Sequence, residues 1–308
     1  MTTMLLDAAS LYFRAFYGVP TSVTTPDGRP INAVRGFLDM TARLLTAHRP
    51  DRLVACWDDD WRPAFRVDAL PSYKAHRVAP EGGEEVPDEL SPQVPVLVDV
   101  LAAAGIARVG APGFEADDII GTLATRARGP VDVVTGDRDL FQLVDDARGV
   151  RVLYTARGIA DIELVDEAAV TSKYGIPGRA YADFAVLRGD PSDGLPGVAG
   201  VGAKTAATLI NEFGSLAGIR AAVARTVVPN PPLTAAVLKK MHAAAGYLDA
   251  APVVVAVACD IDLPPIEGTL PRVPANAPAL AELAAAHGLQ SALKRLGAAL
   301  GWPADVLI

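Results

Sequence analysis

Nine acidic residues lie in short groups spread over much of the chain, and most of them come directly after an apolar run. If the fold gathers them, their mutual repulsion requires cations, and ligand sets made only of oxygen select hard divalent ions such as Mg²⁺ or Mn²⁺. The sequence therefore predicts a site for divalent metal ions. The candidate ligands are Asp7, Asp58, Glu115, Asp117, Asp118, Asp137, Asp139, Asp190 and Asp193.

Some of these acids also have a simpler interpretation. Asp139 precedes a predicted helix and has Gln142 three residues later, which is typical of a capping box and is favoured when the residues are taken alone. The acids at 115–118 could complement the positive end of a helix dipole. Three acids within four residues repel one another, however, and this favours metal binding. Asp7 could equally be an ordinary residue at the end of a strand.

The composition fits a globular protein with an acidic site. The chain has 308 residues, a hydrophobic content of 51% and a net charge of −8. Without the nine acids, 27 acidic residues remain of 36, against 28 Lys plus Arg, so the acidity belongs to the predicted site.

The two cysteines lie in apolar runs and are expected to be buried free thiols. The sequence shows no secretion signal and no membrane-spanning stretch, so we expect a cytoplasmic, monomeric protein.

Short apolar runs alternate with helical patterns in the first half. Strands that alternate with helices indicate an α/β fold with a mostly parallel central sheet, and sites in such sheets lie at the carboxyl ends of the strands. Asp7, Asp58 and Asp137 each follow a predicted strand, so they should lie on one edge. The predicted strands are 4–6, 53–57, 107–109, 131–135 and 150–154, and the predicted helices are 33–47, 95–104 and 116–128.

The second half is predicted to be mainly helical. We expect an α/β core at 1–165 and a helical region at 166–308 that packs on the core as one structural unit. The run VVVAVAC at 253–259 suggests an edge strand. The helical patterns cover 166–174, 178–188, 203–213, 215–225, 233–246 and 277–299.

A glycine-rich segment at 189–213 favours a helix–hairpin–helix. Glycines allow a tight turn between two helices, and a glycine turn at a helix N-terminus exposes backbone N–H groups that can hold a phosphate without reading bases. An ordinary turn with glycine caps is the alternative. The residues predicted to contact DNA here are Gly197, Gly200, Gly202, Lys204 and Thr205.

Residues 62–94 lie between two predicted strands and show no clear hydrophobic periodicity. We expect them to form a poorly ordered arch, or clamp, over the sheet edge. The first part is basic and aromatic, whereas the second carries EGGEE and several prolines. Arg66 and Tyr73 are candidates for DNA binding, because a tyrosine between cations can stack on a base. Solvation of a loop is the simpler alternative for the charges.

In this order, the motifs resemble the 5′ nuclease (flap endonuclease) superfamily, most closely the bacterial 5′–3′ exonuclease domain of DNA polymerase I. The similarity covers about residues 4–260. The chain ends without a polymerase region and looks like a free-standing nuclease. The motifs that carry the resemblance are LLDAASLYFRAF, WDDDWRPAFR, LPSYKAHR, GFEADD, VTGDRDLFQLV and RGDPSDGLPGVAGVGAKTA.

The resemblance implies roles for individual residues. The nine acids would line a site for two or more divalent ions, which replaces the cap interpretation of Asp139. Lys74 and Arg77 match residues of a helical arch, and Arg14 matches a basic residue near the site; all three are expected to be catalytic. The glycine turn would bind duplex and hold K⁺ through carbonyl groups.

The implied activity is metal-dependent hydrolysis of DNA at 5′ ends and flaps, as in primer or flap removal, DNA replication and DNA repair. Partners would be DNA with a 5′ flap, nick or 5′ end, RNA-primer hybrids, and replication or repair proteins. Two alternatives stay open. One is a protein that binds branched DNA structurally with little cleavage, and the other is a PIN-type ribonuclease.

Overall fold

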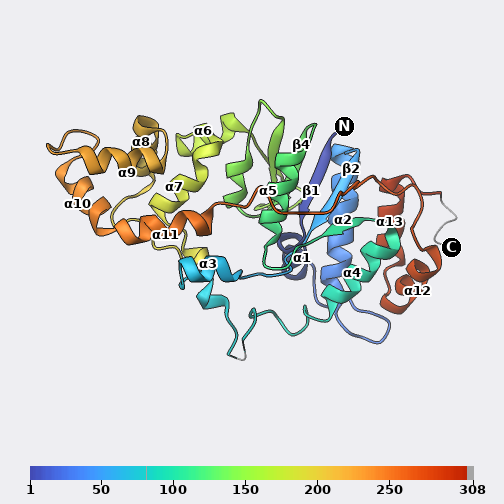
Figure 1. Ribbon diagram of the computed structural model, residues 1–308. Coiled ribbons are helices and arrows are strands. Elements are labelled where there is room, and N and C mark those ends of the chain that lie inside the picture. The colour runs from blue at the N-terminus through green and yellow to red at the C-terminus, as the bar shows by residue number, and fades with distance from the viewer. Residues whose placement is uncertain (81, 304–308) are drawn as a thin grey trace.

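The computed structural model describes residues 1–80 and 82–303 and contains one six-stranded sheet in the order β3-β2-β1-β4-β5-β6 (Figure 1). β6 is antiparallel to β5, and the other pairings are parallel. The predicted strands are therefore confirmed, with β6 as an addition. The strands are β1 (Thr3–Asp7), β2 (Arg52–Cys56), β3 (Ala107–Val109), β4 (Val131–Thr135), β5 (Val150–Tyr154) and β6 (Glu163–Val165).

The strand order creates a switch point between β1 and β4. The chain runs outward from β1 to β3 and then returns to the other side of β1 with β4. Ligand sites in open α/β sheets lie outside the carboxyl ends of the strands at such a point. Asp7 pairs with Cys56, and Leu6 pairs with Val134, so the ends of β1, β2 and β4 are level. The segments that carry the strand-end acids therefore start from one edge.

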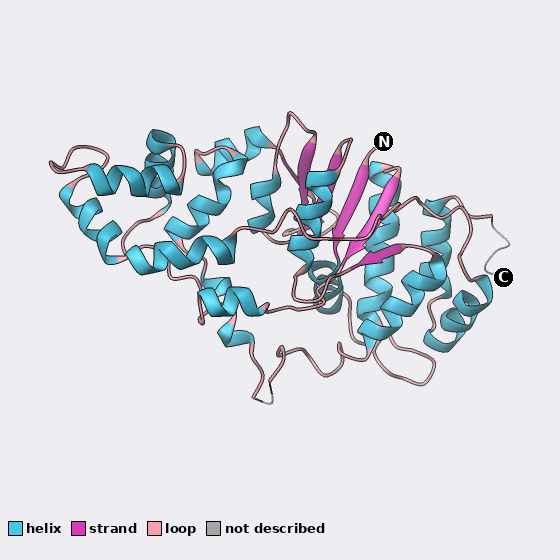
Figure 2. Ribbon diagram, in the orientation of Figure 1, coloured by secondary structure: helices cyan, strands magenta, loops and turns pink. Residues whose placement is uncertain are grey.

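Side chains on β1 alternate between two hydrophobic cores, as the pleat of a strand requires. Leu5 packs in one core cluster, whereas Met4 and Leu6 pack in another on the opposite face. Helices cover both faces (Figure 2). The helices of this part are α1 (Ala8–Gly18), α2 (Asn32–His48), α4 (Gln93–Ala104), α5 (Ala116–Arg126), α12 (Ala277–His287) and α13 (Gln290–Leu300).

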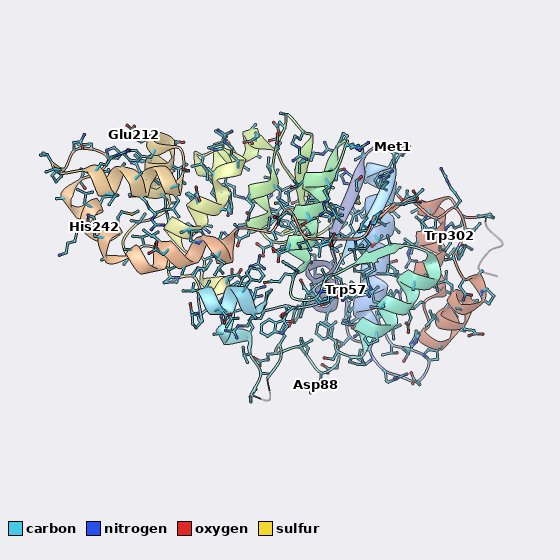
Figure 3. The ribbon with its side chains drawn as sticks, in the orientation of Figure 1. Met1, Trp57, Asp88, Glu212, His242 and Trp302 are labelled. Carbon is cyan, nitrogen blue, oxygen red and sulfur yellow. The ribbon has the colours of Figure 1, made fainter. Side chains whose placement is uncertain are left out.

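The C-terminal helices have a structural role that the sequence did not reveal. α13 packs against α2, and α12 packs against α4, at the end of the molecule where Figure 3 labels Trp302. Leu293 and Leu296 are fully buried in the same core as Phe37 and Leu97. The chain after residue 260 thus completes the hydrophobic cover of one sheet face.

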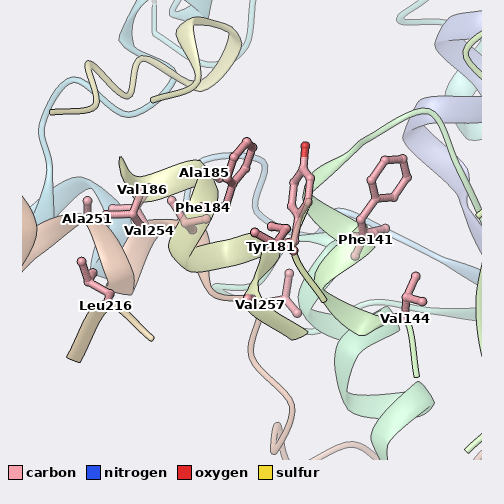
Figure 4. Packing of buried hydrophobic residues seen from close by; sticks show 14 of the residues in the cluster. Phe141, Val144, Tyr181, Phe184, Ala185, Val186, Leu216, Ala251, Val254 and Val257 are labelled. Atoms are coloured by element: carbon pink, nitrogen blue, oxygen red, sulfur yellow. The ribbon is translucent and has the colours of Figure 1, made fainter. Parts of the chain in front are cut away.

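The helical region extends from the other end of the sheet, where Figure 3 labels Glu212 and His242. Tyr181 and Phe184 of α7 lie with Phe141, Val254 and Val257 in one continuous cluster that reaches the sheet (Figure 4). None of the helices in the described part of the chain is long and apolar enough to cross a membrane. The helices here are α6 (Glu167–Tyr174), α7 (Tyr181–Arg188), α8 (Ala203–Phe213), α9 (Leu216–Arg225), α10 (Ala235–Ala243) and α11 (Ala245–Val255).

Two sequence predictions about local structure are wrong. The apolar run at 253–259 does not form an edge strand, because Val254 and Val255 complete α11 and pack in the core of the helical region. The arch segment is not irregular over its first part. It forms α3 (Ala64–Ala69), which packs against α11, and a 3₁₀ turn at Ala75–Arg77. Position 81 of this segment lies outside the described residues.

Candidate active site

A cavity of about 410 Å³ is lined by acids from several elements, among them the last residue of β1 and residues that follow β2 and β4. The convergence predicted from the strand ends is therefore found for these residues. Residues from the arch segment and from the segment after α7 complete the wall. Six of the nine candidate ligands line this cavity: Asp7, Asp58, Glu115, Asp117, Asp137 and Asp190.

Asp7 is held between the end of β1 and the start of α1. Its Oδ1 accepts a hydrogen bond of 3.0 Å from the Ser10 backbone N–H and so caps the helix, while Oδ2 accepts one of 2.6 Å from the Thr135 hydroxyl on β4. The alternative reading of Asp7 as a strand-end residue is thus also true. Its capping role and its place in the cavity are compatible, because a carboxylate can accept several hydrogen bonds.

Asp58 is fixed by the next helix in the site. The Ala116 backbone N–H donates a hydrogen bond of 2.6 Å to Asp58 Oδ1. Free N–H groups at a helix start favour a negative charge, so the first turn of α5 orients an acid from the β2 end. Glu115 and Asp117, which flank Ala116, face the same cavity.

Burial and mutual repulsion raise the pKa values of the acids at this site. Burial raises the pKa of Asp7 to about 7, and the Asp58 charge adds to the shift. Burial also raises the pKa of Asp58, Asp117, Asp139 and Asp193, and Asp137 is the next largest cause for Asp117 and Asp139. A neighbouring cation would relieve this repulsion. Strongly shifted pKa values in a group of neighbouring acids are typical of functional sites.

Asp139 and Asp193 adjoin the cavity without lining it. The Asp139 carboxylate does not cap the 3₁₀ turn that it begins, and its Oδ1 is buried without a hydrogen-bond partner among the described residues. The capping interpretation is therefore wrong. Gln142 instead donates to the Asp139 backbone carbonyl at 2.7 Å. A buried acceptor left free beside other acids fits a ligand that awaits a cation.

The arch segment is docked against the chain that follows α7. The Lys74 backbone N–H donates to the Asp193 carbonyl at 3.0 Å, and the Ser72 hydroxyl donates to the Gly194 carbonyl at 2.9 Å. Gly194 has φ +74°, and a Cβ there would lie 2.2 Å from the Ser72 carbonyl oxygen, so only glycine fits. The contact places the cationic end of the arch segment at the acidic cavity.

Lys74 and Arg77, both predicted as catalytic, line the cavity. Lys74 forms an ion pair with Glu115, and its pKa lies well above its usual value because Glu115 and Tyr73 outweigh the opposing effect of burial. Arg77 donates to the Ser192 carbonyl at 2.7 Å and to Asp193 Oδ1 at 3.0 Å. Both cations therefore sit where they could face a phosphate.

Arg14 lies beside this cavity and not in its wall. Its Nη1 is 3.5 Å from the Ala156 carbonyl, and its Nε is buried without a partner in the described part of the chain. It lines an adjoining cavity that shares Ser10 and Phe13 with the acidic one. The structure thus places Arg14 near the site, without a direct contact to the acids.

Three predicted site residues have a structural role instead. Arg66 is buried and donates to both oxygens of Asp118, at 2.6 and 2.8 Å, and to Glu115 Oε1 at 2.9 Å. Tyr73 is also buried, and its hydroxyl donates to Glu115 Oε1 at 2.6 Å. The predicted DNA contacts of Arg66 and Tyr73 are therefore wrong for this conformation, because neither reaches the surface. Asp118 faces Arg66, away from the cavity.

The glycine turn precedes α8 as predicted. Gly197 has φ +69°, and a Cβ there would lie 2.5 Å from the backbone of Gly189, so the turn packs tightly on the end of α7. Gly202 is the N-cap of α8 without a side-chain cap, and Lys204 in the first turn is exposed. The carbonyl of Gly200 accepts a hydrogen bond of 2.8 Å from Lys240 of α10. The Lys240 ammonium would repel a cation bound at this carbonyl oxygen.

Sequence reasoning missed several residues of the cavity wall. Glu84 reaches it from the arch segment, and burial raises its pKa with a further contribution from Asp58. Nothing in EGGEE distinguished this acid from its neighbours. Arg138 and Tyr154 also line the cavity. The position of Arg138 between Asp137 and Asp139 was a signal that could have been used.

The donor set fits divalent cations by its chemistry, since it offers several buried carboxylates, one of them with an unpartnered oxygen. Yet within residues 1–80 and 82–303, no three Asp, Glu, His or Cys side chains are arranged to hold one ion as they stand. The carboxylates surround the cavity instead, and Lys74 balances part of their charge. Binding an ion would draw them inward.

The family models decide the classification. The model described as 5′-3′ exonuclease, N-terminal resolvase-like domain, matches residues 2–175, and that described as 5′-3′ exonuclease, C-terminal SAM fold, matches residues 176–276. The chain belongs to the 5′–3′ exonuclease family. It is 61% identical over 298 residues to a 5′-3′ exonuclease of Streptomyces coelicolor, which covers 95% of this chain and 98% of that protein.

Other relatives of this exonuclease family differ in length. The chain is 48% identical over 219 residues to DNA polymerase I of Mycobacterium tuberculosis, which covers 70% of this chain and 23% of the polymerase. The fold is shared with the T5 D15 protein co-crystallised with metal ions, at a TM-score of 0.64, 18% identity and coverage of 97% and 98%. The catalytic core of Rad2 in complex with a DNA substrate matches at 0.56, 17% identity, and 99% and 90% coverage.

Proposed function

We propose that this exonuclease hydrolyses phosphodiester bonds of DNA at 5′ ends and 5′ flaps with the help of divalent metal ions. The observation that carries the proposal is the cavity that six of the predicted ligand acids share with Lys74 and Arg77. Membership of the 5′–3′ exonuclease family supports the polarity. The DNA in the Rad2 complex and the metal ions with the T5 protein support the two ligand classes.

Mg²⁺ or Mn²⁺ would be held by the acids of the cavity together with Asp139 and Asp193. Bound there, such ions supply a nucleophile from water and neutralise the leaving oxygen. A backbone N–H group holds one oxygen of Asp7 and one oxygen of Asp58 at the cavity wall, so both acids are at the site before an ion binds. Asp118 is left out of the ligand set, because Arg66 and the Ala258 N–H occupy its oxygens.

Lys74 and Arg77 would stabilise the negative charge of the phosphate. Lys74 is paired with Glu115, and Arg77 with Asp193. A divalent ion held by Glu115 and Asp193 would replace these pairings and leave Lys74 and Arg77 to face a phosphate in the cavity. Positive charges beside the negative charge that develops on the phosphate would lower the barrier.

The glycine turn would bind duplex behind the cut. The exposed first turn of α8 offers backbone N–H groups and Lys204 to one phosphate, a contact that positions DNA without reading its sequence. Asp190 and Asp193 lie only a few residues before this turn. The segment that binds the duplex is therefore covalently continuous with the acids that bind the ions. We expect the same site to accept RNA-primer hybrids.

The decisive experiment compares three labelled substrates of equal sequence: a 5′-flap DNA, the same flap made of RNA, and blunt duplex. We expect cleavage of the DNA flap in Mg²⁺ or Mn²⁺, with products that carry a 5′ label, and none in EDTA. Tight binding without cleavage would contradict the proposal and favour a structural branched-DNA protein. Preference for the RNA flap would favour a PIN-type ribonuclease.

A further inference from the structure

Three cationic side chains line the acidic cavity, and they differ in how firmly they are held. Lys74 is 12% exposed and is ion-paired with Glu115. Arg77 is 35% exposed and makes two hydrogen bonds. Arg138 is 41% exposed, and within the described part of the chain its one ion pair is a 3.6 Å approach to Asp190, beyond hydrogen-bond length. Arg138 is therefore the cation most available to a ligand.

Arg138 can move away from Asp190 without leaving the buried Asp190 carboxylate unpaired. The Asp190 carboxylate accepts a hydrogen bond of 3.0 Å from the Ser192 N–H and another from the Ser192 hydroxyl, and Arg188 lies 3.5 Å away. An unpaired buried carboxylate would be costly, but these partners remain when Arg138 moves. The guanidinium is thus free to turn toward the cavity.

Arg138 also enters the cavity from a different element than the other two cations. Lys74 and Arg77 belong to the arch segment, whereas Arg138 lies on the turn after β4 and shares the wall with Tyr154 of β5. A DNA strand carries one charge per phosphate, and the wall also holds seven carboxylates, counting Glu84. Neighbouring phosphates therefore need compensation of their own, and a planar guanidinium can bind a phosphate through two hydrogen bonds.

We propose that Arg138, beside Tyr154, binds a phosphate of the cleaved strand next to the scissile one. This subsite rests on the proposed nuclease function and deepens it. The scissile phosphate would face the metal-binding acids and Lys74, and Arg138 would fix the adjoining phosphate so that the strand enters in one register. Arg138 is then a substrate-binding residue whose charge acts on DNA and not on the ions.

The test uses Arg138→Ala and Arg138→Lys, with Arg295→Ala as the matched control. Arg295 is 48% exposed and is paired with Asp39 on a helix face outside the cavity. We expect Arg138→Ala to raise KM for 5′-flap DNA about 10-fold, the order of one hydrogen bond to a charged group. Arg138→Lys should recover part of this loss. The Mn²⁺ concentration that gives half-maximal rate should not change.

A charge scan of the substrate then identifies the phosphate. Single linkages on each side of the cut are replaced by neutral methylphosphonates, and each substrate is tested with the parent and with Arg138→Ala. The expected result is one linkage, next to the scissile one, whose neutralisation weakens binding to the parent but not to Arg138→Ala. The other linkages should affect both proteins alike.

Two results would overturn the subsite. One is the same scan profile for the parent and for Arg138→Ala. The other is a fall in kcat with a shifted Mn²⁺ midpoint and unchanged KM, which would mean that Arg138 acts through Asp137 and Asp139. In both cases the parent still cleaves the flap, so failure of the subsite is distinguishable from failure of the nuclease proposal. Should Arg138→Ala fold poorly, Arg138→Gln carries the same comparison.

Discussion

The guanidinium of Arg66 holds the carboxylate of Asp118 through hydrogen bonds of 2.6 and 2.8 Å in a fully buried position. The same side chain donates to the Val254 carbonyl at 3.0 Å. One arginine thus joins α3, the start of α5 and the end of α11. Because α3 leads into the arch segment, this contact helps set Lys74 relative to the acids.

Arg66→Met should lower the free energy of unfolding by about 3–5 kcal/mol, since it leaves Asp118 buried without its partner. Urea denaturation of the metal-free protein measures the change. The matched control is Arg295→Met, which breaks a partly exposed pair with Asp39 and should cost less than about 1 kcal/mol. Equal losses in the two variants would contradict the structural role of Arg66.

Tyr73→Phe separates a buried hydrogen bond from a base-stacking role. The change removes only the hydroxyl that donates to Glu115 at 2.6 Å, and it should cost about 1–3 kcal/mol of stability. Affinity for flap DNA should stay the same. If Tyr73 instead stacked on a base, Tyr73→Phe would leave stability intact and Tyr73→Ala would weaken binding. Denaturation and fluorescence anisotropy distinguish the two cases.

The sequence was sufficient to predict the sheet and its acidic edge. Asp7, Asp58 and Asp137 follow strands of a parallel sheet, whose carboxyl ends meet at one edge whatever the details of packing. The order of the elements carries this information. Helix starts such as that of α5 were also visible from the spacing of apolar and acidic residues.

Burial of polar residues could not be predicted, because it depends on partners far along the chain. Arg66 and Tyr73 stand in a basic, aromatic segment that is typical of DNA-binding surfaces. Their partners lie about 40 to 190 positions away, at Glu115, Asp118 and Val254. The run at 253–259 has high strand propensity, yet packing against α3 and α7 makes its first part helical.

Asp137→Asn should retain DNA binding and lose most cleavage, at least about 100-fold in kcat. Asp137 lines the cavity. Burial raises the pKa of Asp117 and Asp139, and the Asp137 charge is the next largest cause of both shifts. The substitution keeps the shape but replaces a negatively charged carboxylate with a neutral amide, which weakens its attraction for a divalent ion. Single-turnover cleavage and anisotropy in EDTA measure the two effects. Near-normal turnover would remove Asp137 from the ligand set.

The metal-free protein should lose stability as the pH rises from about 4 to about 8. The folded pKa of Asp7 is about 7, above its ordinary value of 3.8, so the folded state holds a proton that the unfolded state releases. Stability from this group is complete below the ordinary value and is lost as pH passes the folded value, on the order of 4 kcal/mol. Asp58, Asp117, Asp139 and Asp193 shift in the same direction.

Divalent ions should reverse this trend, because they bind the deprotonated acids. Mg²⁺ is therefore expected to raise Tm more at pH 8 than at pH 5, while NaCl of equal ionic strength does not. Thermal unfolding with and without Mg²⁺ at both values provides the measurement. A stability that rises with pH in EDTA would show that the buried acids are not repelling one another.

Lys204→Ala tests whether the first turn of α8 holds a phosphate. Lys204 is exposed beside the uncapped N-terminus at Gly202, so it can neutralise one phosphate of duplex. Losing that contact should weaken binding and lower the slope of log K against log salt by about 0.9. Lys294→Ala, an exposed lysine on α13 at the other end of the molecule, is the control and should change neither quantity.

Because the cavity is untouched, kcat at saturating DNA should remain that of the parent. An unchanged salt slope would exclude Lys204 from the duplex contact and leave only the backbone N–H groups of the turn.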